Sequence, residues 1–448
     1  MTELPFRVAY DAHTARAEIL RRAPLGHASL PARAQEKLES VFGAPISAED
    51  AVDRIIADVR DTGDEALRRY SRLIDGVELG ALQVPPAELQ SALGGLPVAL
   101  RQALETAAAR VRAFHERQPR QSWLHWEGDG ALGQMVLPLE RVGVYVPGGT
   151  APLASSLIMA AVPAQVAGVD EIVVCTPPQR GTGLPHPVVM ATAALLGLER
   201  VYCLGGAQAI AALALGTETV PKVDKVVGPG NVFVVLAKKA LYGAVGIESL
   251  PGPTETLIIA DSGADAATVA ADMLAQAEHL MASAIVITTA PEMVPGLAAE
   301  VDRRLQEAGA EAVRESLRLR GGVVVCRNLA EAMSLANEYA PEHLCLLVQD
   351  PWALLPTIRH AGGVFLGEWS SEALGDYAIG PSHIMPTGGT ARFASPVNVW
   401  DFMKITSVFA AGRATAESVG EAAAVLAGAE GLTFHRDAIL RRQGTSSE

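Results

Sequence analysis

The spacing of apolar residues divides the chain into a helical first part and a longer part of alternating strands and helices. Residues 48–75 and 97–118 carry apolar side chains at intervals of three and four positions, with acidic residues near their starts. This spacing places the apolar side chains on one face of a helix. We therefore predict that residues 1–140 form amphipathic helices that lead into a core.

From Arg141 onward, short runs rich in β-branched residues alternate with Gly-rich turns and Ala-rich stretches. A first series of runs lies at 141–146, 171–175, 200–204 and 224–227, and a second at 256–261, 283–289, 321–326, 343–348 and 362–367. Continuous apolar runs of this length are typical of buried parallel strands, whose neighbours need helical crossovers. The two series predict two α/β domains, each built on a parallel sheet.

The end of the chain follows neither pattern. Residues 368–407 are rich in Gly, Pro, Ser and Thr, and a long irregular stretch in a compact protein usually carries a site. Residues 415–443 return to helical spacing, with a break at Gly431. The predicted division is a helical segment of residues 1–140 that packs with the second α/β domain, α/β domains of residues 141–254 and 255–395, and a small helical C-terminal extension of residues 396–448.

Composition narrows the class of protein. The chain has 448 residues, 49% of them hydrophobic, which is enough for more than one core, and its formal net charge is -14 without any block of basic residues. We therefore expect no nucleic-acid and no membrane partner. The first residues lack the apolar run of a signal peptide, which predicts a cytoplasmic protein. Four cysteines stand singly in apolar surroundings and predict buried, reduced thiols: Cys175, Cys203, Cys326 and Cys345.

Two pairs of residues lie beside predicted elements and could carry chemistry. Gln276 and His279 are three positions apart in a helical pattern, so both side chains could reach one metal ion, although a lone pair of this kind fits a polar helix end better. Glu342 and His343 directly precede an apolar strand, at an edge where α/β proteins tend to place catalytic groups. Taken alone, that pair fits a polar strand start better than a catalytic pair.

Other candidates lie in the irregular stretch, in the tail and in two turns. Asp376 and His383 occur where glycines allow side chains to be aimed at a cavity, and Glu430 and His435 flank the break in the tail. The turns at 205–208 (GGAQ) and 228–231 (GPGN) join a strand to a helix, where backbone N–H groups favour a pyrophosphate. On these residues alone, the sequence favours a nucleotide-binding α/β enzyme and leaves open whether it binds a metal ion.

Seven segments resemble the histidinol dehydrogenase family, in that family's order, from about residue 45 to the end. They are RVGVYVPGGTAPLASS (141–156), GGAQAIAALALGTETVPKVDKVVGPGN (205–231), PGPTETLIIADSGAD (251–265), DMLAQAEH (272–279), YAPEHL (339–344), GDYAIGPSHIMPTGGTARF (375–393) and AEGLTFH (429–435). The continuous run at 205–231 is the most specific of them. The resemblance implies incomplete Rossmann-like domains and an NAD-dependent, zinc-dependent oxidation of L-histidinol to L-histidine through bound histidinal, the last step of histidine biosynthesis.

The resemblance also implies roles for particular residues. Catalytic bases would be Glu342 and His343. NAD contacts would be Tyr145, Gln208 and Asn231, and ligands of one zinc ion per subunit would be Gln276, His279, Asp376 and His435. The substrate would be bound by these four ligands together with Thr254, His343, His383 and Glu430. The family forms homodimers whose C-terminal segments cross over, so Glu430 and His435 would complete the partner's site.

Three positions differ from the residues that the family most often has: Thr254, Leu280 and Ser382. None of them removes a proposed ligand or base, but they bear on how the substrate fits. We therefore keep open a related dehydrogenase that oxidises another small alcohol, such as a sulfonated diol, to its acid. More distant alternatives are a zinc hydrolase, which would need no NAD, and a non-catalytic scaffold with a stabilising zinc ion.

Overall fold

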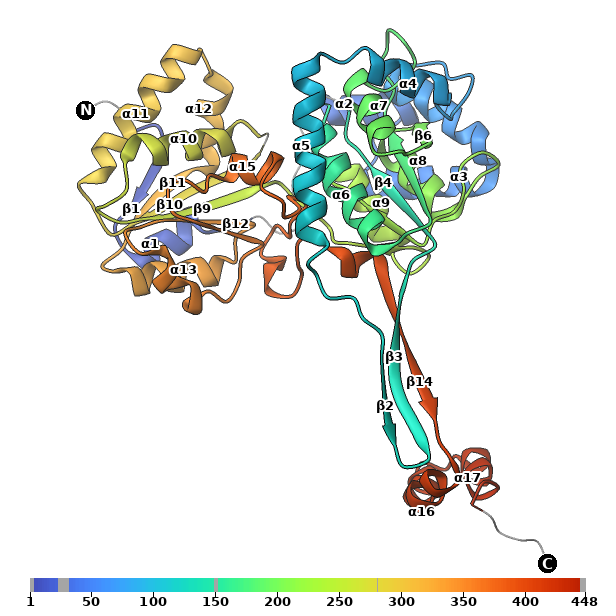
Figure 1. Ribbon diagram of the computed structural model, residues 1–448. Helices are drawn as coiled ribbons and strands as arrows, with labels where there is room; N and C mark the ends of the chain where they lie inside the picture. Colours follow the sequence, from blue (N-terminus) through green and yellow to red (C-terminus); the bar gives the residue numbers. More distant parts are fainter. Residues whose placement is uncertain (1–3, 23–31, 149–151, 280, 444–448) are drawn as a thin grey trace, which may run out of the picture.

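The computed structural model describes residues 4–22, 32–148, 152–279 and 281–443, so Leu280 and part of the turn after residue 146 lie outside the described residues. Figure 1 shows two α/β units side by side and a long arm that extends from one of them, with the C-terminal helices at the arm's far end. The predicted α/β class, with two parallel sheets and a small helical tail, is confirmed. Among the described residues, no helix is long and apolar enough to cross a membrane.

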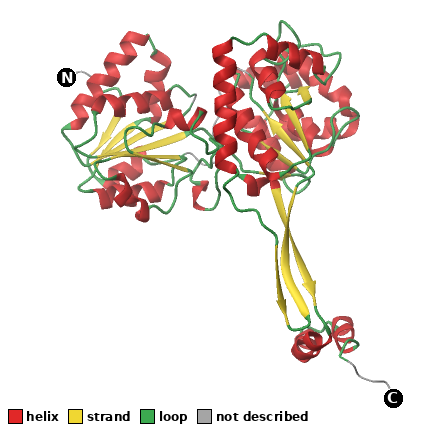
Figure 2. Ribbon diagram, in the orientation of Figure 1, coloured by secondary structure: helices red, strands yellow, loops and turns green. Residues whose placement is uncertain are grey.

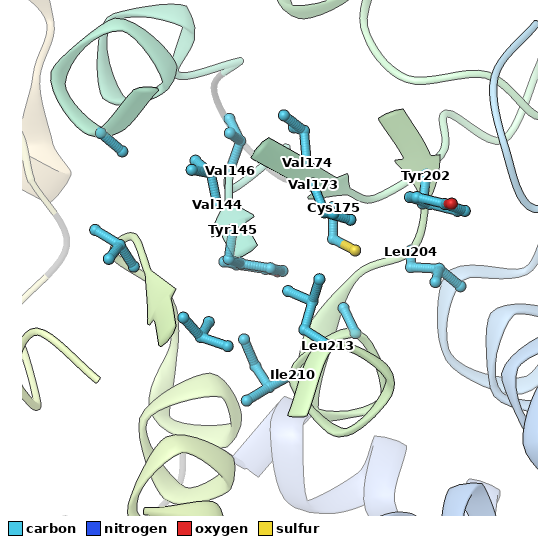
Figure 3. Close-up of a cluster of buried hydrophobic side chains, with 14 of the residues drawn as sticks. Val144, Tyr145, Val146, Val173, Val174, Cys175, Tyr202, Leu204, Ile210 and Leu213 are labelled. Carbon is cyan, nitrogen blue, oxygen red and sulfur yellow. The ribbon is translucent and has the colours of Figure 1, made fainter. Parts of the chain in front are cut away.

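The first unit, here called the 141–247 unit, contains the first predicted series of strands. Its sheet is parallel, in the order β6-β5-β4-β7-β8. The strands are β4 (Arg141–Tyr145), β5 (Glu171–Thr176), β6 (Arg200–Cys203), β7 (Lys225–Val227) and β8 (Gly246–Ile247), and the helices are α6 (Ala154–Ala167), α7 (Pro187–Leu195), α8 (Gly206–Leu215) and α9 (Val232–Leu241). Figure 3 shows Tyr145 and Cys175, which are paired on adjacent strands, pointing toward Ile210 and Leu213 of α8 within the apolar core of this unit.

The long N-terminal helices cover this same unit. They are α2 (Ala32–Phe42), α3 (Ala48–Tyr70) with the π-turn η2 (Ser71–Asp75), α4 (Pro86–Gly94) and α5 (Val98–His115). Helix α3 packs on α8 and α9, α4 on α7, and α5 on α6. The sequence predicted packing on the other unit, but the apolar faces of these helices complete the core around β4–β7. Only the first described residues join the second unit: β1 (Arg7–Ala9), α1 (Ala12–Thr14) and η1 (Ala15–Ile19).

The second unit, here called the 255–366 unit, contains the second predicted series. Its parallel sheet has the order β1-β11-β10-β9-β12-β13. The strands are β9 (Glu255–Ala260), β10 (Ser283–Thr288), β11 (Gly322–Val325), β12 (His343–Leu347) and β13 (Gly363–Leu366), and the helices are α10 (Ala266–Ala277), α11 (Met293–Ala308), α12 (Glu311–Arg320), α13 (Leu329–Tyr339), α14 (Pro351–Leu354) and η3 (Leu355–Thr357). An apolar cluster packs on each face of the sheet. The strands predicted in both series are confirmed.

The remaining segments form a connection and the arm. After α15 (Glu372–Tyr377) and the short 3-10 turns η4 (Thr390–Arg392) and η5 (Val399–Phe402), strand β14 (Met403–Ala410) pairs with β3 (Gly130–Pro138), which pairs with β2 (Trp123–Glu127). Helices α16 (Arg413–Ala429) and α17 (Thr433–Leu440) follow, separated at Gly431 as predicted. Figure 2 shows these three antiparallel strands running away from both units. The sequence predicted neither β2, β3 nor β14, because most of their side chains face solvent in this chain and give no core-facing pattern.

Candidate active site

Most of the candidate residues meet where the two units face each other. His343 begins β12 and lies opposite Thr256 of β9, and Gln276 lies in the last turn of α10, just before β10. These residues are therefore at the amino edge of the 255–366 sheet, whereas α/β sheets usually bind ligands at the carboxyl edge. The 141–247 unit lies against this edge of the 255–366 unit. Ser156, on the helix after β4, forms a hydrogen bond with His383 across the gap between the units, with an Oγ–Nε2 distance of 3.0 Å.

Glu342 is a buried carboxylate held in one orientation. Its Oε2 accepts hydrogen bonds from Thr254 Oγ1 at 2.6 Å and from the Glu255 backbone N at 2.9 Å. The Thr254 hydroxyl in turn accepts a bond from Gln276 Nε2 at 3.2 Å. Burial raises the pKa of Glu342 well above its usual value, and the two donated bonds oppose that rise. A carboxylate with a raised pKa is suited to accept a proton near neutral pH.

Only one of the two polar atoms of the Gln276 amide takes part in this hydrogen-bond network. Its Nε2 donates to Thr254, but its Oε1 is buried and has no hydrogen-bond partner. A buried, unpaired amide oxygen is costly, so a ligand at that oxygen would restore the balance. His279 follows one helical turn later and lies near His343 and His383, whose ring pKa values are lowered mainly by burial and to a smaller extent by this neighbouring histidine.

His343 presents its two ring nitrogens to different surroundings. Its Nδ1 lies 3.4 Å from Thr256 Oγ1, 3.6 Å from Glu372 Oε1 and 3.9 Å from Glu342 Oε2. Its Nε2 is buried without a hydrogen-bond partner. Burial lowers the pKa of His343 to about 4, so the ring is neutral at neutral pH and one nitrogen can act as a base.

Glu372 is a site residue that the sequence reasoning missed. It is 5% exposed, accepts a short hydrogen bond from Thr256 Oγ1, and has a pKa that burial raises to about 7. It begins α15, four residues before Asp376, so the two carboxylates share one face of this helix. That spacing was the signal in the sequence, but a lone pair of acids four apart is common on solvated helices.

Asp376 and His383 lie together, as the sequence predicted for side chains of the irregular stretch. His383 Nδ1 donates to the Asp376 carbonyl oxygen at 2.8 Å and lies 3.8 Å from Asp376 Oδ1. Burial raises the pKa of Asp376 to about 6 and lowers that of His383 to about 4. Since a carbonyl only accepts, the neutral His383 ring carries its proton on Nδ1, and its Nε2 accepts from Ser156. Ser382 also bridges the units, through a hydroxyl that donates to the Met159 carbonyl at 3.0 Å.

Two candidates lie elsewhere in the same chain. Glu430 caps the end of α16 and His435 lies on α17, both exposed, at the far end of the arm (Figure 1). The structure therefore does not bring them to the other candidates within one chain. Within the described residues, no group of three or more His, Cys, Asp or Glu side chains is placed to hold a metal ion. Only His279 and Asp376 of the proposed ligands near the site belong to those residue types.

The proposed cofactor residues lie at the carboxyl edge of the 141–247 sheet. Tyr145 ends β4, and its hydroxyl accepts a hydrogen bond from Gly206 N at 3.1 Å. Gln208 is fully buried, yet neither its Oε1 nor its Nε2 has a partner. Asn231 caps α9 and accepts from the backbone N of Phe233 at 3.0 Å, which is sufficient structural reason for an Asn there. The unpaired Gln208 amide is the feature at this edge that folding alone does not explain.

A buried ion pair, which the sequence analysis did not predict, supports the turn at residues 228–231. Lys238 Nζ donates to Glu248 Oε1 at 2.7 Å and to the Gly228 carbonyl at 2.5 Å, and Glu248 Oε1 accepts from Gly228 N at 2.8 Å. Gly228 has φ +129°, and a Cβ there would lie 2.0 Å from the Tyr145 carbonyl oxygen. The backbone N–H and the carbonyl group of Gly228 are thus both held by one ion pair, directly beside Tyr145.

Comparisons with known proteins show which family the chain belongs to. The sequence profile of the family described as histidinol dehydrogenase matches residues 44–443. The chain is 53% identical over 416 residues to the histidinol dehydrogenase of Deinococcus radiodurans, covering 92% of this chain and 95% of that relative. It is 50% identical over 397 residues to that of Thermus thermophilus, covering 88% and 94%.

A solved structure has the same fold over the whole length. The crystal structure of histidinol dehydrogenase from Elizabethkingia anophelis matches with a TM-score of 0.90 and 30% identity, covering 100% of both chains. The likeness therefore includes both α/β units, the arm and the tail. This chain belongs to the histidinol dehydrogenase family of oxidoreductases.

Proposed function

We propose that this chain catalyses the NAD-dependent, four-electron oxidation of L-histidinol to L-histidine through bound histidinal, with one zinc ion per subunit. The relatives' names supply the substrate. The observation that carries the chemistry is the pairing of Glu342 with His343, a buried carboxylate beside a neutral imidazole whose Nε2 has no partner. Two bases side by side suit a reaction that must remove protons in two successive oxidations.

The side chains near the site fit a catalytic zinc ion. The proposed ligands are Gln276, His279 and Asp376, completed by His435 of the partner subunit. Oxygen and nitrogen donors without cysteine are usual for a catalytic zinc ion. Gln276 Oε1 is such an oxygen, and it is buried without a hydrogen-bond partner in this chain. When bound, the ion would hold the amino alcohol through its nitrogen atoms and so keep the alcohol carbon facing the cofactor.

The proposed NAD residues lie across the gap between the units. Tyr145, Gln208 and Asn231 mark the carboxyl edge of the other sheet, where strand ends and helix starts favour a dinucleotide. NAD would accept the hydride in both oxidations. The unpartnered Gln208 amide offers a donor and an acceptor for this cofactor.

The bases then have separate tasks. His343 Nε2 takes the hydroxyl proton as the carbinol carbon is oxidised to the aldehyde. Glu342 takes a proton from the water that adds to the aldehyde, which gives the hydrate that is oxidised to the carboxylate. Thr254, His383 and Glu430 would bind the substrate, with Glu430 supplied by the partner. Holding the reacting groups in place can lower the activation barrier by about 7 kcal/mol or more.

A second copy of the chain is the proposed partner. The arm leaves large apolar side chains in solvent, among them Trp126 at 75%, Phe409 at 83% and Phe434 at 88% exposure. Several large apolar side chains exposed on one arm favour an interface there. A dimer in which each arm reaches the other subunit would cover it and would bring Glu430 and His435 to a site.

The experiment is NADH production from L-histidinol, with and without a zinc chelator, counting NADH formed per histidine. We expect two NADH per histidine, loss of turnover on chelation, and recovery with added zinc. A sulfonated diol serves as the comparison substrate. Faster oxidation of the diol would overturn the proposed substrate, and hydrolysis of an amide or ester without NAD would point to a hydrolase.

The variant Glu342→Gln tests the division of labour between the bases. It should slow the oxidation of histidinal more than that of histidinol, because only the second oxidation needs an activated water. Both rates are measured with the substrate added directly. Histidinal oxidation at the parent rate would remove Glu342 from the water-activating role.

A further inference from the structure

We infer that Thr256 and Glu372 are positioning residues that keep the proton of the His343 ring on Nδ1, so that Nε2 is always the basic nitrogen. This inference rests on the proposed function, because it concerns how the base of that reaction is prepared. Neither residue is among the ligands, bases or binding residues proposed above.

The hydrogen-bond pattern determines which atom donates its proton in each contact. Thr256 Oγ1 donates its single proton to Glu372 Oε2. The same oxygen lies 3.4 Å from His343 Nδ1, and while Glu372 is ionised the hydroxyl proton is already used, so the ring nitrogen is the donor in that contact. The order of donation is therefore from His343 to Thr256 to Glu372.

Oxygen atoms surround Nδ1 on other sides as well. Glu372 Oε1 lies 3.6 Å from it and Glu342 Oε2 lies 3.9 Å from it. With the proton on Nε2 instead, the lone pair of Nδ1 would face these carboxylates. The structure thus favours the tautomer with Nδ1 protonated, and that tautomer leaves Nε2, which has no partner, free to accept the substrate proton.

Burial keeps this arrangement free of competing water. His343 is 3% exposed, Thr256 0% and Glu372 5%. The Phe365 ring lies 5.8 Å from the imidazole, centre to centre, and limits its rotation. Strand pairing adds a further constraint, because Thr256 and His343 are direct partners in the β9–β12 register. The imidazole is therefore oriented by elements of the sheet rather than by a loop.

The alternative is that Thr256 and Glu372 only help the sheet and α15 to pack. The two explanations differ in what a loss of the Thr256 hydroxyl does. If the hydroxyl serves packing alone, its removal lowers stability and leaves the rate per folded enzyme unchanged. If it orients the ring, its removal lowers kcat and alters the tautomer of His343.

The test uses three variants of the zinc-loaded, full-length enzyme. Thr256→Val removes the hydroxyl and keeps the shape of the side chain, while Thr256→Ser keeps the hydroxyl. Thr288→Val is the matched control, since Thr288 is a buried residue at the opposite end of a strand in the same sheet and its hydroxyl contacts only Ala290, within its own turn. We expect Thr256→Val to lower kcat by roughly 10- to 100-fold with little change in KM for L-histidinol, and Thr256→Ser and Thr288→Val to keep kcat within about threefold of the parent.

A spectroscopic measurement decides between the two explanations. The ring nitrogens are labelled with nitrogen-15, and the His343 signals are identified by their loss in His343→Gln. The parent should show the proton on Nδ1, and Thr256→Val should show a mixture of tautomers. A parent ring with its proton on Nε2, or an unchanged tautomer and kcat in Thr256→Val, would overturn the inference.

The two proposals fail separately. If the parent shows no NADH production from L-histidinol, the proposed function is wrong, while the tautomer in the parent and in Thr256→Val still shows whether these residues orient the ring. If the parent is active and the tautomer does not respond to Thr256→Val, only the positioning role is wrong.

Discussion

Mixing two inactive variants should restore activity if each site uses residues from both subunits. One variant, Glu342→Gln, damages the site on the body of the chain. The other, His435→Ala, damages only the end of the arm, which Figure 1 places far from β12, the strand that Glu342 directly precedes, in the same chain. In the proposed dimer, each variant alone would have two damaged sites.

The expected recovery follows from counting sites. Random association of equal amounts gives about half hybrid dimers, and in each hybrid one site combines an intact body with an intact arm. About a quarter of all sites are then complete, so the mixture should show about a quarter of the parent rate. If the arm served its own subunit, every site in the hybrid would carry one damaged residue and the rate would stay near that of the separate variants.

The assay is NADH formation after subunit exchange, with hybrids isolated by two different affinity tags. Purified hybrids should have about half the parent rate per dimer, because one of their two sites is complete. The control pairs Glu342→Gln with His343→Gln, two changes in the same body, which cannot complement each other. Verified hybrids that stay inactive in the first pairing would refute the shared site.

Three further outcomes are expected. His279→Ala should bind less zinc than one ion per subunit by metal analysis, whereas the exposed His13→Ala should keep it; an unchanged zinc content would remove His279 from the ligands. Lys238→Met should lower the free energy of unfolding by about 3–5 kcal/mol, measured by thermal unfolding, because it leaves the buried Glu248 carboxylate unpaired. Arg101→Met removes a cation from an exposed ion pair and should lower it by under about 1 kcal/mol. Equal effects of the two variants would contradict this expectation. The four cysteines should react slowly with a thiol reagent until the chain unfolds, since burial raises the pKa of Cys203 to about 12 and leaves almost no thiolate at pH 8; rapid reaction in the folded enzyme would argue against it.

The strands that the sequence predicted share one physical property. Every residue of β9 and of β12 is buried, so their apolar runs are continuous and easily recognised. The arm strands lack that signal, since all residues of β2 are exposed in the single chain. Most of their side chains do not face the chain's own core, so a search for core-facing patterns does not find them.

The candidate site was predictable only where its residues lie close together in the sequence. Gln276 with His279 and Glu342 with His343 are neighbours along the chain, and the structure brings both pairs to one edge of the sheet. Glu372 acts on His343 through Thr256, and these three residues are far apart in sequence. Contacts of that kind depend on strand register and on the placement of α15, which the sequence does not state.

The two units also divide the proposed chemistry between them. The bases and the nearby metal ligands belong to the 255–366 unit and the segment after it, whereas the NAD residues belong to the 141–247 unit. Hydrogen bonds from Ser382 and Ser156 join these parts at the gap. A reaction with two hydride transfers must exchange NAD once while the aldehyde stays bound, because a free amino aldehyde is reactive. In the proposed reaction, holding the intermediate on one unit and the cofactor on the other would let NADH leave without disturbing the contacts that retain the aldehyde.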